Sequence, residues 1–174
     1  MATASSDRTD KKIIFAELTF KEIMSHPRFG SAEDFERAHE ESYFYHIIGA
    51  KDSFLQEINE AYKLGLLPYQ VNEPALAKKL NAKMLHSIEL DEIINLKNDS
   101  TSWLAIAIRL RNHGTHQSNI PRLFDEVISS KTSSTRYFID PMTNTQLKTD
   151  IPTFMEQCLI DVKALISRLR TTLP

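Results

Sequence analysis

Apolar residues recur at three- and four-residue steps along most of the chain, a spacing that predicts α-helices rather than β-strands. Proline, glycine and short polar residues interrupt this pattern at the places where helices commonly begin and end. A glycine at position 65 is the expected stop of the longest helix. The expected helices cover residues 11–24, about 32–64, 72–96 with a bend, 103–113 and 150–170.

A short alternating segment, Tyr137-Phe138-Ile139, predicts a β-strand, and Asp140-Pro141 with Asn144 favours a turn after it. An all-β fold is disfavoured because the chain of 174 residues has only 4 glycines for turns. The predicted fold class is therefore all-α, an antiparallel bundle of four to five helices with a short β-hairpin near residues 137–147. Residues 1–10 are small and polar and are expected to be disordered, with a single domain over residues 11–174.

Composition narrows the class of protein further. Apolar residues make up 41% of the chain and charged residues 25%, which is typical of a soluble globular protein and excludes a mostly disordered one. No apolar run approaches the roughly 20 residues of a spanning helix, and the N-terminus has no pattern of a secretory signal. A single cysteine, Cys158, cannot form an internal disulfide, so a cytoplasmic location without membrane contact is expected.

The formal net charge of -2 disfavours an extended nucleic-acid-binding surface. This small total hides an asymmetry along the chain. Residues 31–66 carry eight acidic and three basic side chains, whereas residues 100–136 carry five basic and two acidic ones. A compact positive site in the second segment is therefore compatible with the near-neutral total.

Strong polar groups gather at the end of one predicted helix, in the run Arg109-Leu110-Arg111-Asn112-His113-Gly114-Thr115-His116. Arg111 follows Leu104 and Ile108 by seven and three residues, so it lies on their packed side of the helix. A guanidinium there needs a carboxylate, a set of carbonyls or an anionic ligand. Gly114 is the expected helix stop, and a turn there would bring His116 beside Arg111. On a continued helix the two would lie about 140° apart.

The order Arg111-Asn112, then three residues, then His116, inside an all-α chain, resembles the motif of the HEPN family. The resemblance covers about residues 11–172, with a long helix before the motif and another behind it. It implies a metal-independent ribonuclease without cofactor, acting as a homodimer in a defence or toxin-type system. Some members of the family lack activity and serve as scaffolds or ligand-binding domains, so the resemblance also allows an RNA-binding role without cleavage.

The same resemblance implies roles for the motif residues. His116 would act as general acid or base on RNA, and Arg111 would stabilise the phosphate charge. Asn112 would orient either the histidine or the phosphate. His113 and Arg109 are weaker candidates for substrate binding. Toxins modified by a nucleotidyltransferase antitoxin carry a tyrosine two residues after the histidine; here that residue is Ser118, which disfavours that branch.

Two other functions remain open on the sequence. The first is a non-catalytic dimerisation or regulatory protein, in which Arg111 forms a structural ion pair with Glu40 or Glu41. The second is a metal-dependent bundle hydrolase. Its divalent ion would be held by histidines on separate helices, His46 and His116 together with His39 or His86.

Several other residues that carry reactive or aromatic groups are expected in the core. Cys158 belongs to the apolar stripe of the last helix and is expected to pack as a small hydrophobe. The adjacent aromatic residues Tyr43, Phe44 and Tyr45 are likewise expected in the core rather than on a base-stacking surface.

Overall fold

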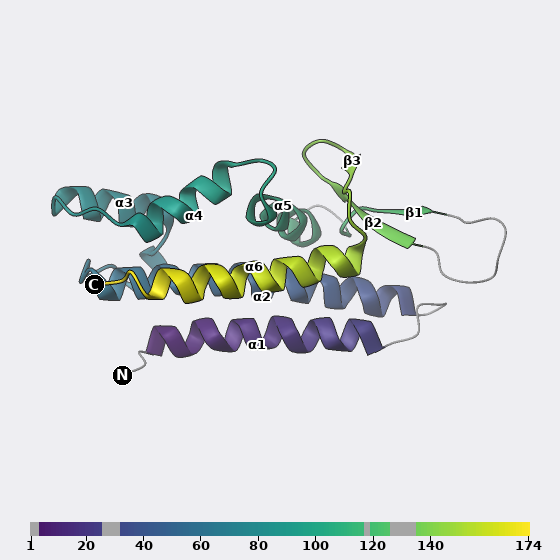
Figure 1. Cartoon of the computed structure of the whole chain (residues 1–174), viewed down its shortest axis with the longest axis horizontal. Helices are drawn as coiled ribbons and strands as arrows, with labels where there is room; N and C mark the ends of the chain where they lie inside the picture. The colour runs from purple at the N-terminus through teal and green to yellow at the C-terminus, as the bar shows by residue number, and fades with distance from the viewer. Residues whose placement is uncertain (1–3, 26–31, 117–118, 126–134) are drawn as a thin grey trace.

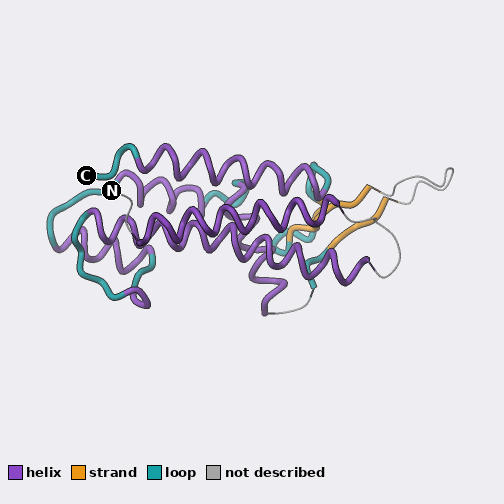
Figure 2. The backbone as a smooth tube through the Cα atoms, turned by 90° about the horizontal axis from the view of Figure 1, so that it is seen from below, coloured by secondary structure: helices purple, strands orange, loops and turns teal. Residues whose placement is uncertain are grey.

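Three long helices run side by side along the molecule: α1 (Ala4–Ser25), α2 (Ala32–Ala61) and α6 (Ile151–Arg170) (Figure 1). The computed structural model describes residues 4–25, 32–116, 119–125 and 135–174. Helix α1 runs antiparallel to both α2 and α6, so the two chain ends lie at the same end of the molecule (Figure 2). The predicted antiparallel all-α bundle is confirmed.

The shorter helices cover one side of this layer. Helices α3 (Glu73–Ala82) and α4 (Ile88–Asn98) lie toward the end that carries the termini, after the short 3-10 turn Pro68–Gln70. Helix α5 (Trp103–His116) lies above α6 in Figure 1 and is seen nearly end-on. Each of α3, α4 and α6 begins at a side chain that accepts a bond from a backbone N–H of the first turn. The side-chain oxygen of Asn72 accepts from the backbone N–H of Ala75 at 3.0 Å. In the same way Ser87 accepts from Leu90 at 3.1 Å and Asp150 accepts from Thr153 at 2.8 Å.

A three-stranded antiparallel sheet precedes α6, in the order β1 (Arg122–Asp125), β2 (Thr135–Asp140) and β3 (Thr145–Gln146). Strands β2 and β3 form the hairpin that the sequence predicted near residues 137–147. Strand β1 was not expected, because its four residues show no alternation long enough to signal a strand. In the register of β1 with β2, Arg122 is opposite Phe138.

Buried apolar side chains of α1, α2, α5, α6 and β2 form one connected core. Phe44 lies within it, with Phe138 and Phe154 around its ring. Cys158 is fully buried in this core, as predicted, and burial raises the pKa of its thiol. The side chain of Tyr43 is also buried and donates its hydroxyl to the carbonyl of Met155, which ties α2 to α6.

The prediction of a disordered N-terminus is wrong for residues 4–10, which form the first two turns of α1; residues 1–3 lie outside the described chain. Polar contacts explain the difference. Arg170, near the end of α6, donates to Asp10 at 2.7 Å and to the carbonyl of Ser6 at 3.2 Å. Thr9 is fully buried. Small polar residues here fit tightly between helices, a use that composition alone does not reveal.

Gly114 does not stop α5, which continues as far as His116, so this prediction is also wrong. The backbone of Gly114 is not in the left-handed region, unlike that of Gly65, whose φ is 72°. The glycine instead permits close packing. A Cβ atom at this position would lie 3.1 Å from Cγ1 of Ile120 and 3.2 Å from Cγ of Glu41.

No helix in the described part of the chain is both long enough and apolar enough to cross a lipid bilayer.

Candidate functional site

Arg111 lies in a pocket on the surface of α2, between α1 and α5, which we call the Arg111 pocket. Its volume is about 240 Å³. Helix α1 contributes two cations, α2 contributes a mixed polar and apolar floor, and α5 contributes Arg111. The residues that line it are Arg8, Lys12, Tyr45, Ile48, Gly49, Asp52, Ser53, Gln56 and Arg111.

Within the described residues, no carboxylate pairs with the guanidinium of Arg111. Its Nε atom is buried and finds no hydrogen-bond partner among the described residues. Glu40, one of the two ion-pair partners expected from the sequence, instead accepts a hydrogen bond from Arg122. No ion pair joins Arg111 to Glu41 in the described chain either. A buried, unpaired N–H of a cation is costly, so an anionic ligand that accepts it would be stabilised there.

Positive charge dominates the Arg111 pocket. Arg8, Lys12 and Arg111 converge on it, and the acidic residue that lines it is Asp52. The carboxylate of Asp52 lies 2.5 Å from Nζ of Lys51, so a further lysine offsets its charge. Three convergent cations on a compact site are suited to a phosphate group, to which arginine donates through its planar fork.

A glycine in the middle of α2 makes room for one of these cations. Lys12 lies across Gly49, where a Cβ atom would come within 3.2 Å of the lysine Cδ. The ammonium of Lys12 then sits 4.4 Å from the centre of the Tyr45 ring, a cation–π contact. Gly49 thus permits the close approach of α1 on which the pocket depends.

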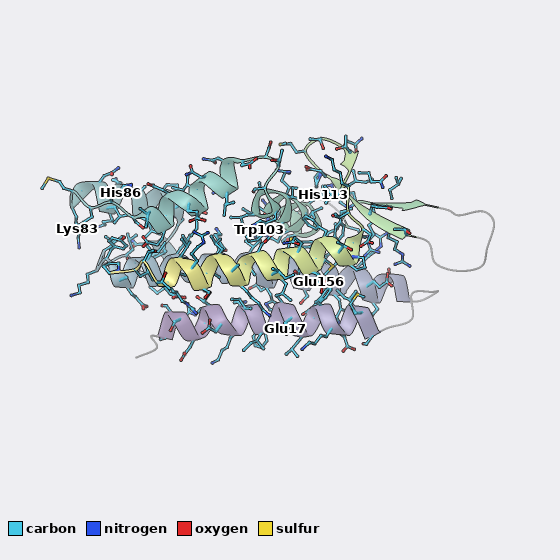
Figure 3. All side chains as sticks on the ribbon, in the orientation of Figure 1. Glu17, Lys83, His86, Trp103, His113 and Glu156 are labelled. Atoms are coloured by element: carbon cyan, nitrogen blue, oxygen red, sulfur yellow. The ribbon has the colours of Figure 1, made fainter. Side chains whose placement is uncertain are left out.

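The other motif residues do not share the Arg111 pocket. Asn112 and His116 are exposed, and because α5 continues past Gly114, His116 lies about 140° around the helix from Arg111. His113, labelled in Figure 3, is half-buried, and its Nδ1 atom is buried without a partner in the described chain. Within one chain, Arg111 and His116 of the motif therefore lie on different sides of α5.

Arg109 has a structural role. Its Nε donates to Oδ1 of Asp140 at 2.8 Å and its Nη2 to Oδ2 at 2.6 Å, a two-bond ion pair that joins α5 to the end of β2. Another bond from Nη2 reaches the carbonyl of Ser100 at 2.8 Å. Three of the five N–H donors of this guanidinium are thus used within the chain, which argues against the predicted role in substrate binding.

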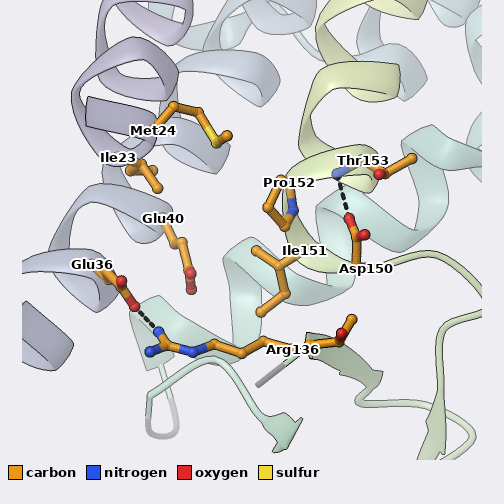
Figure 4. Close-up of a pocket in the computed structure, with 10 residues that line it drawn as sticks. Ile23, Met24, Glu36, Glu40, Arg136, Asp150, Ile151, Pro152 and Thr153 are labelled. Atoms are coloured by element: carbon orange, nitrogen blue, oxygen red, sulfur yellow. Dashed lines mark hydrogen bonds and ion pairs between the residues drawn. The ribbon is translucent and has the colours of Figure 1, made fainter. Parts of the chain in front are cut away.

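Two acidic residues of α2, Glu36 and Glu40, line a second pocket together with Arg136, beside the start of α6 (Figure 4). Glu36 pairs with Arg136 of β2, and Glu40 pairs with Arg122 of β1. All four side chains are mostly or fully buried. Burial raises the pKa of Glu40 to about 7, although the Arg122 guanidinium opposes the shift. Each carboxylate has an arginine, so this cluster ties the sheet to α2 and leaves no unpaired acid for a ligand.

The predicted metal-site histidines do not converge. Nδ1 of His39 lies 2.8 Å from the carbonyl of Phe35 in its own helix, and His86 pairs with Asp91 at 2.7 Å. Within the described residues, no three histidine, cysteine or acidic side chains come close enough together to hold a metal ion. The metal-hydrolase alternative therefore lacks a ligand set in this part of the chain.

Sequence reasoning missed three residues of the Arg111 pocket. Arg8 was assigned to a disordered segment, and Lys12 was not singled out. Tyr45 was expected in the core with Tyr43 and Phe44, which are indeed fully buried, whereas Tyr45 is 59% exposed. Successive residues of a helix point about 100° apart, and that rotation was the available signal that three adjacent aromatics cannot share one face.

A family model matches residues 1–174, the whole chain, and the chain therefore belongs to that family, the family of unknown function DUF6586. No curated protein and no solved structure matches it.

Proposed function

We propose that this DUF6586 protein binds RNA by holding a backbone phosphate in the Arg111 pocket, as a HEPN-like candidate for a metal-independent endoribonuclease. One observation carries the proposal: among the described residues no carboxylate pairs with the guanidinium of Arg111, whose buried Nε has no partner, and it lines a site shared with Arg8 and Lys12. An arginine in a purely structural network would be paired, as Arg109 and Arg122 are. The regulatory alternative, with Arg111 paired to Glu40 or Glu41, loses its specific support.

Cleavage is the finer part of the proposal, and it requires a second copy of the chain. His116 lies on the other side of α5 from Arg111, so the histidine that acts beside a phosphate in the Arg111 pocket would come from a homodimer partner. His116 would serve as general acid or base, since the pKa of histidine lies near neutral pH. A cytoplasmic location and a defence or toxin-type setting complete this proposal.

The first test is binding of a fluorescent single-stranded RNA to the wild-type protein and to Arg111→Gln. Loss of charge-assisted hydrogen bonds predicts an affinity about 10- to 100-fold weaker for the variant. Arg168→Gln is the matched control, because it removes the same charge from an exposed residue that pairs with Glu92. Equal affinity of wild type and Arg111→Gln would refute the role of this pocket.

A second test addresses cleavage, with a chelator present throughout. Wild type is expected to cleave RNA, while His116→Ala retains binding and loses cleavage. In mixtures of Arg111→Gln with His116→Ala, mixed dimers would contain one intact site and recover part of the activity. The catalytic part of the proposal would fail if His116→Ala cleaved RNA at the wild-type rate, or if none of the proteins cleaved RNA. The binding part would stand in both cases.

A further inference from the structure

Three rings form a row on the surface shared by α1 and α2. The ring centroid of Tyr45 lies 5.4 Å from that of His46, and His46 lies 5.3 Å from Phe15 of α1. Tyr45 is 59% exposed and Phe15 is 44% exposed. These two rings contribute little to the core, so burial does not account for their position.

The row starts at the Arg111 pocket. Tyr45 is part of the pocket wall, and the Lys12 ammonium lies over its ring at 4.4 Å. Burial and the nearby Lys12 charge lower the pKa of His46, so its imidazole is neutral at neutral pH and adds a ring rather than a charge. Cations at one end and rings leading away from them therefore form one continuous surface.

We propose that this row is a base-stacking platform and that the ligand is single-stranded RNA, with one phosphate in the Arg111 pocket and adjacent bases on Tyr45 and Phe15. The inference rests on the proposed function and specifies its substrate class. Exposed aromatics beside a positive groove are how proteins hold single strands, since every base offers a ring face. In a duplex those faces are already stacked and the row would have nothing to contact.

Exposed apolar residues continue the same side of α1, notably Ile14 at 51% and Leu18 at 55%. Such a face also suits contact with a second copy of the chain. The three cations beside the rings favour an anionic occupant of the rings, because two copies packed face to face across the rings would bring like charges together. The dimer proposed above needs only His116 of the partner at the Arg111 pocket. Self-association through this face is therefore an outcome for the experiment to exclude.

The test compares three probes: a short single-stranded oligouridine, the same strand in a duplex, and inorganic polyphosphate, which has the charge without the bases. Wild type is expected to prefer the single strand. Tyr45→Leu should weaken oligouridine binding about 5- to 100-fold, the range for loss of one stacked base, and should weaken polyphosphate binding much less. Tyr45→Phe keeps the ring and should bind within about twofold of wild type. Tyr69→Leu, at a tyrosine that is 80% exposed, is the matched control.

The outcomes separate this inference from the proposed function. If wild type binds no RNA, the proposed function fails, and the platform with it. If wild type and Tyr45→Leu bind oligouridine equally while Arg111→Gln binds weakly, the phosphate pocket stands and the platform is refuted. Equal affinity for duplex also refutes the platform. The platform is also refuted if light scattering shows that Tyr45→Leu turns a dimer into a monomer while its RNA affinity is unchanged. The face would then be a contact between two copies of the chain.

Discussion

Four arginines between positions 109 and 136 share one residue type but differ in their surroundings. Three are paired with buried carboxylates: Arg109 with Asp140, Arg122 with Glu40, and Arg136 with Glu36. Arg111 has no such partner within the described chain. Because a buried guanidinium must be compensated, this difference marks Arg111 as the one of the four that is suited to an anionic ligand.

Two glycines allow a prediction on packing. Gly→Ala inside a helix usually stabilises a protein by up to about 1 kcal/mol. At Gly114 the new Cβ would meet buried Ile120, which cannot move aside, whereas at Gly49 it would meet the flexible stem of Lys12. Gly114→Ala is therefore expected to be the less stable of the two variants in urea unfolding. A larger gain in stability from Gly114→Ala would contradict the close packing at that site.

Glu40 predicts a dependence of stability on pH. Its pKa is raised from 4.5 to about 7 in the folded protein, so between these values the native state holds a proton that the unfolded state has lost. Stability from this group is therefore greatest below pH 4.5 and falls as pH rises to 7. Glu40→Gln cannot titrate. From pH 5 to pH 8, wild type should lose up to about 3 kcal/mol of unfolding free energy relative to this variant.

Denaturant unfolding at several pH values measures this difference directly. A wild-type stability that runs parallel to that of Glu40→Gln across the whole range would show that Arg122 keeps the carboxylate ionised throughout. The buried pair would then be a fixed ion pair in the neutral range.

Helix α5 and the hairpin show what ties the elements together. The Arg109–Asp140 pair joins them, and both side chains are largely buried. We expect Arg109→Ala to lower the unfolding free energy by about 3 kcal/mol, since it strands the Asp140 carboxylate. At temperatures where the variant is folded, its RNA affinity should equal that of wild type. If Arg109→Ala has normal stability but binds RNA weakly, Arg109 takes part in RNA binding and its pair with Asp140 is not its main role.

At the scale of elements the sequence was most informative where periodicity is strong. Helix α6 begins at the predicted Asp150 cap and ends at Arg170, and the apolar stripe that contains Cys158 is buried as expected. The errors occur at Gly114 and at residues 4–10. In both places the local structure depends on contacts with distant segments. Glu41 packs against Gly114, and Arg170 binds the segment 4–10 through Asp10. Local patterns carry no information on such partners.

The same reasoning explains how much of the site was predictable. Arg111 was singled out because its helical position directs it toward packed surface. The pocket around it could not be foreseen, because Arg8 and Lys12 come from a helix about a hundred residues earlier in the chain. The separation of Arg111 from His116 depended on whether α5 ended at Gly114, and the predicted stop there was wrong.

Across the whole molecule the charge asymmetry now has a structural account. The acidic stretch on α2 neutralises Arg122 and Arg136 rather than Arg111. Asp140 neutralises Arg109. What remains is a compact group of Arg111, Arg8 and Lys12 on a chain of net charge -2, which suits a ligand held by few phosphates.

The most direct test of a phosphate site at Arg111 is the salt dependence of binding to single-stranded RNA, measured for wild type and Arg111→Gln. Neutralisation of the one phosphate held in the Arg111 pocket should contribute about -0.7 to the wild-type slope of log affinity against log salt. The variant should lose most of this contribution, so its slope should be smaller in magnitude by up to about 0.7. Identical slopes for the two proteins would contradict the account, because Arg111 would then neutralise no phosphate.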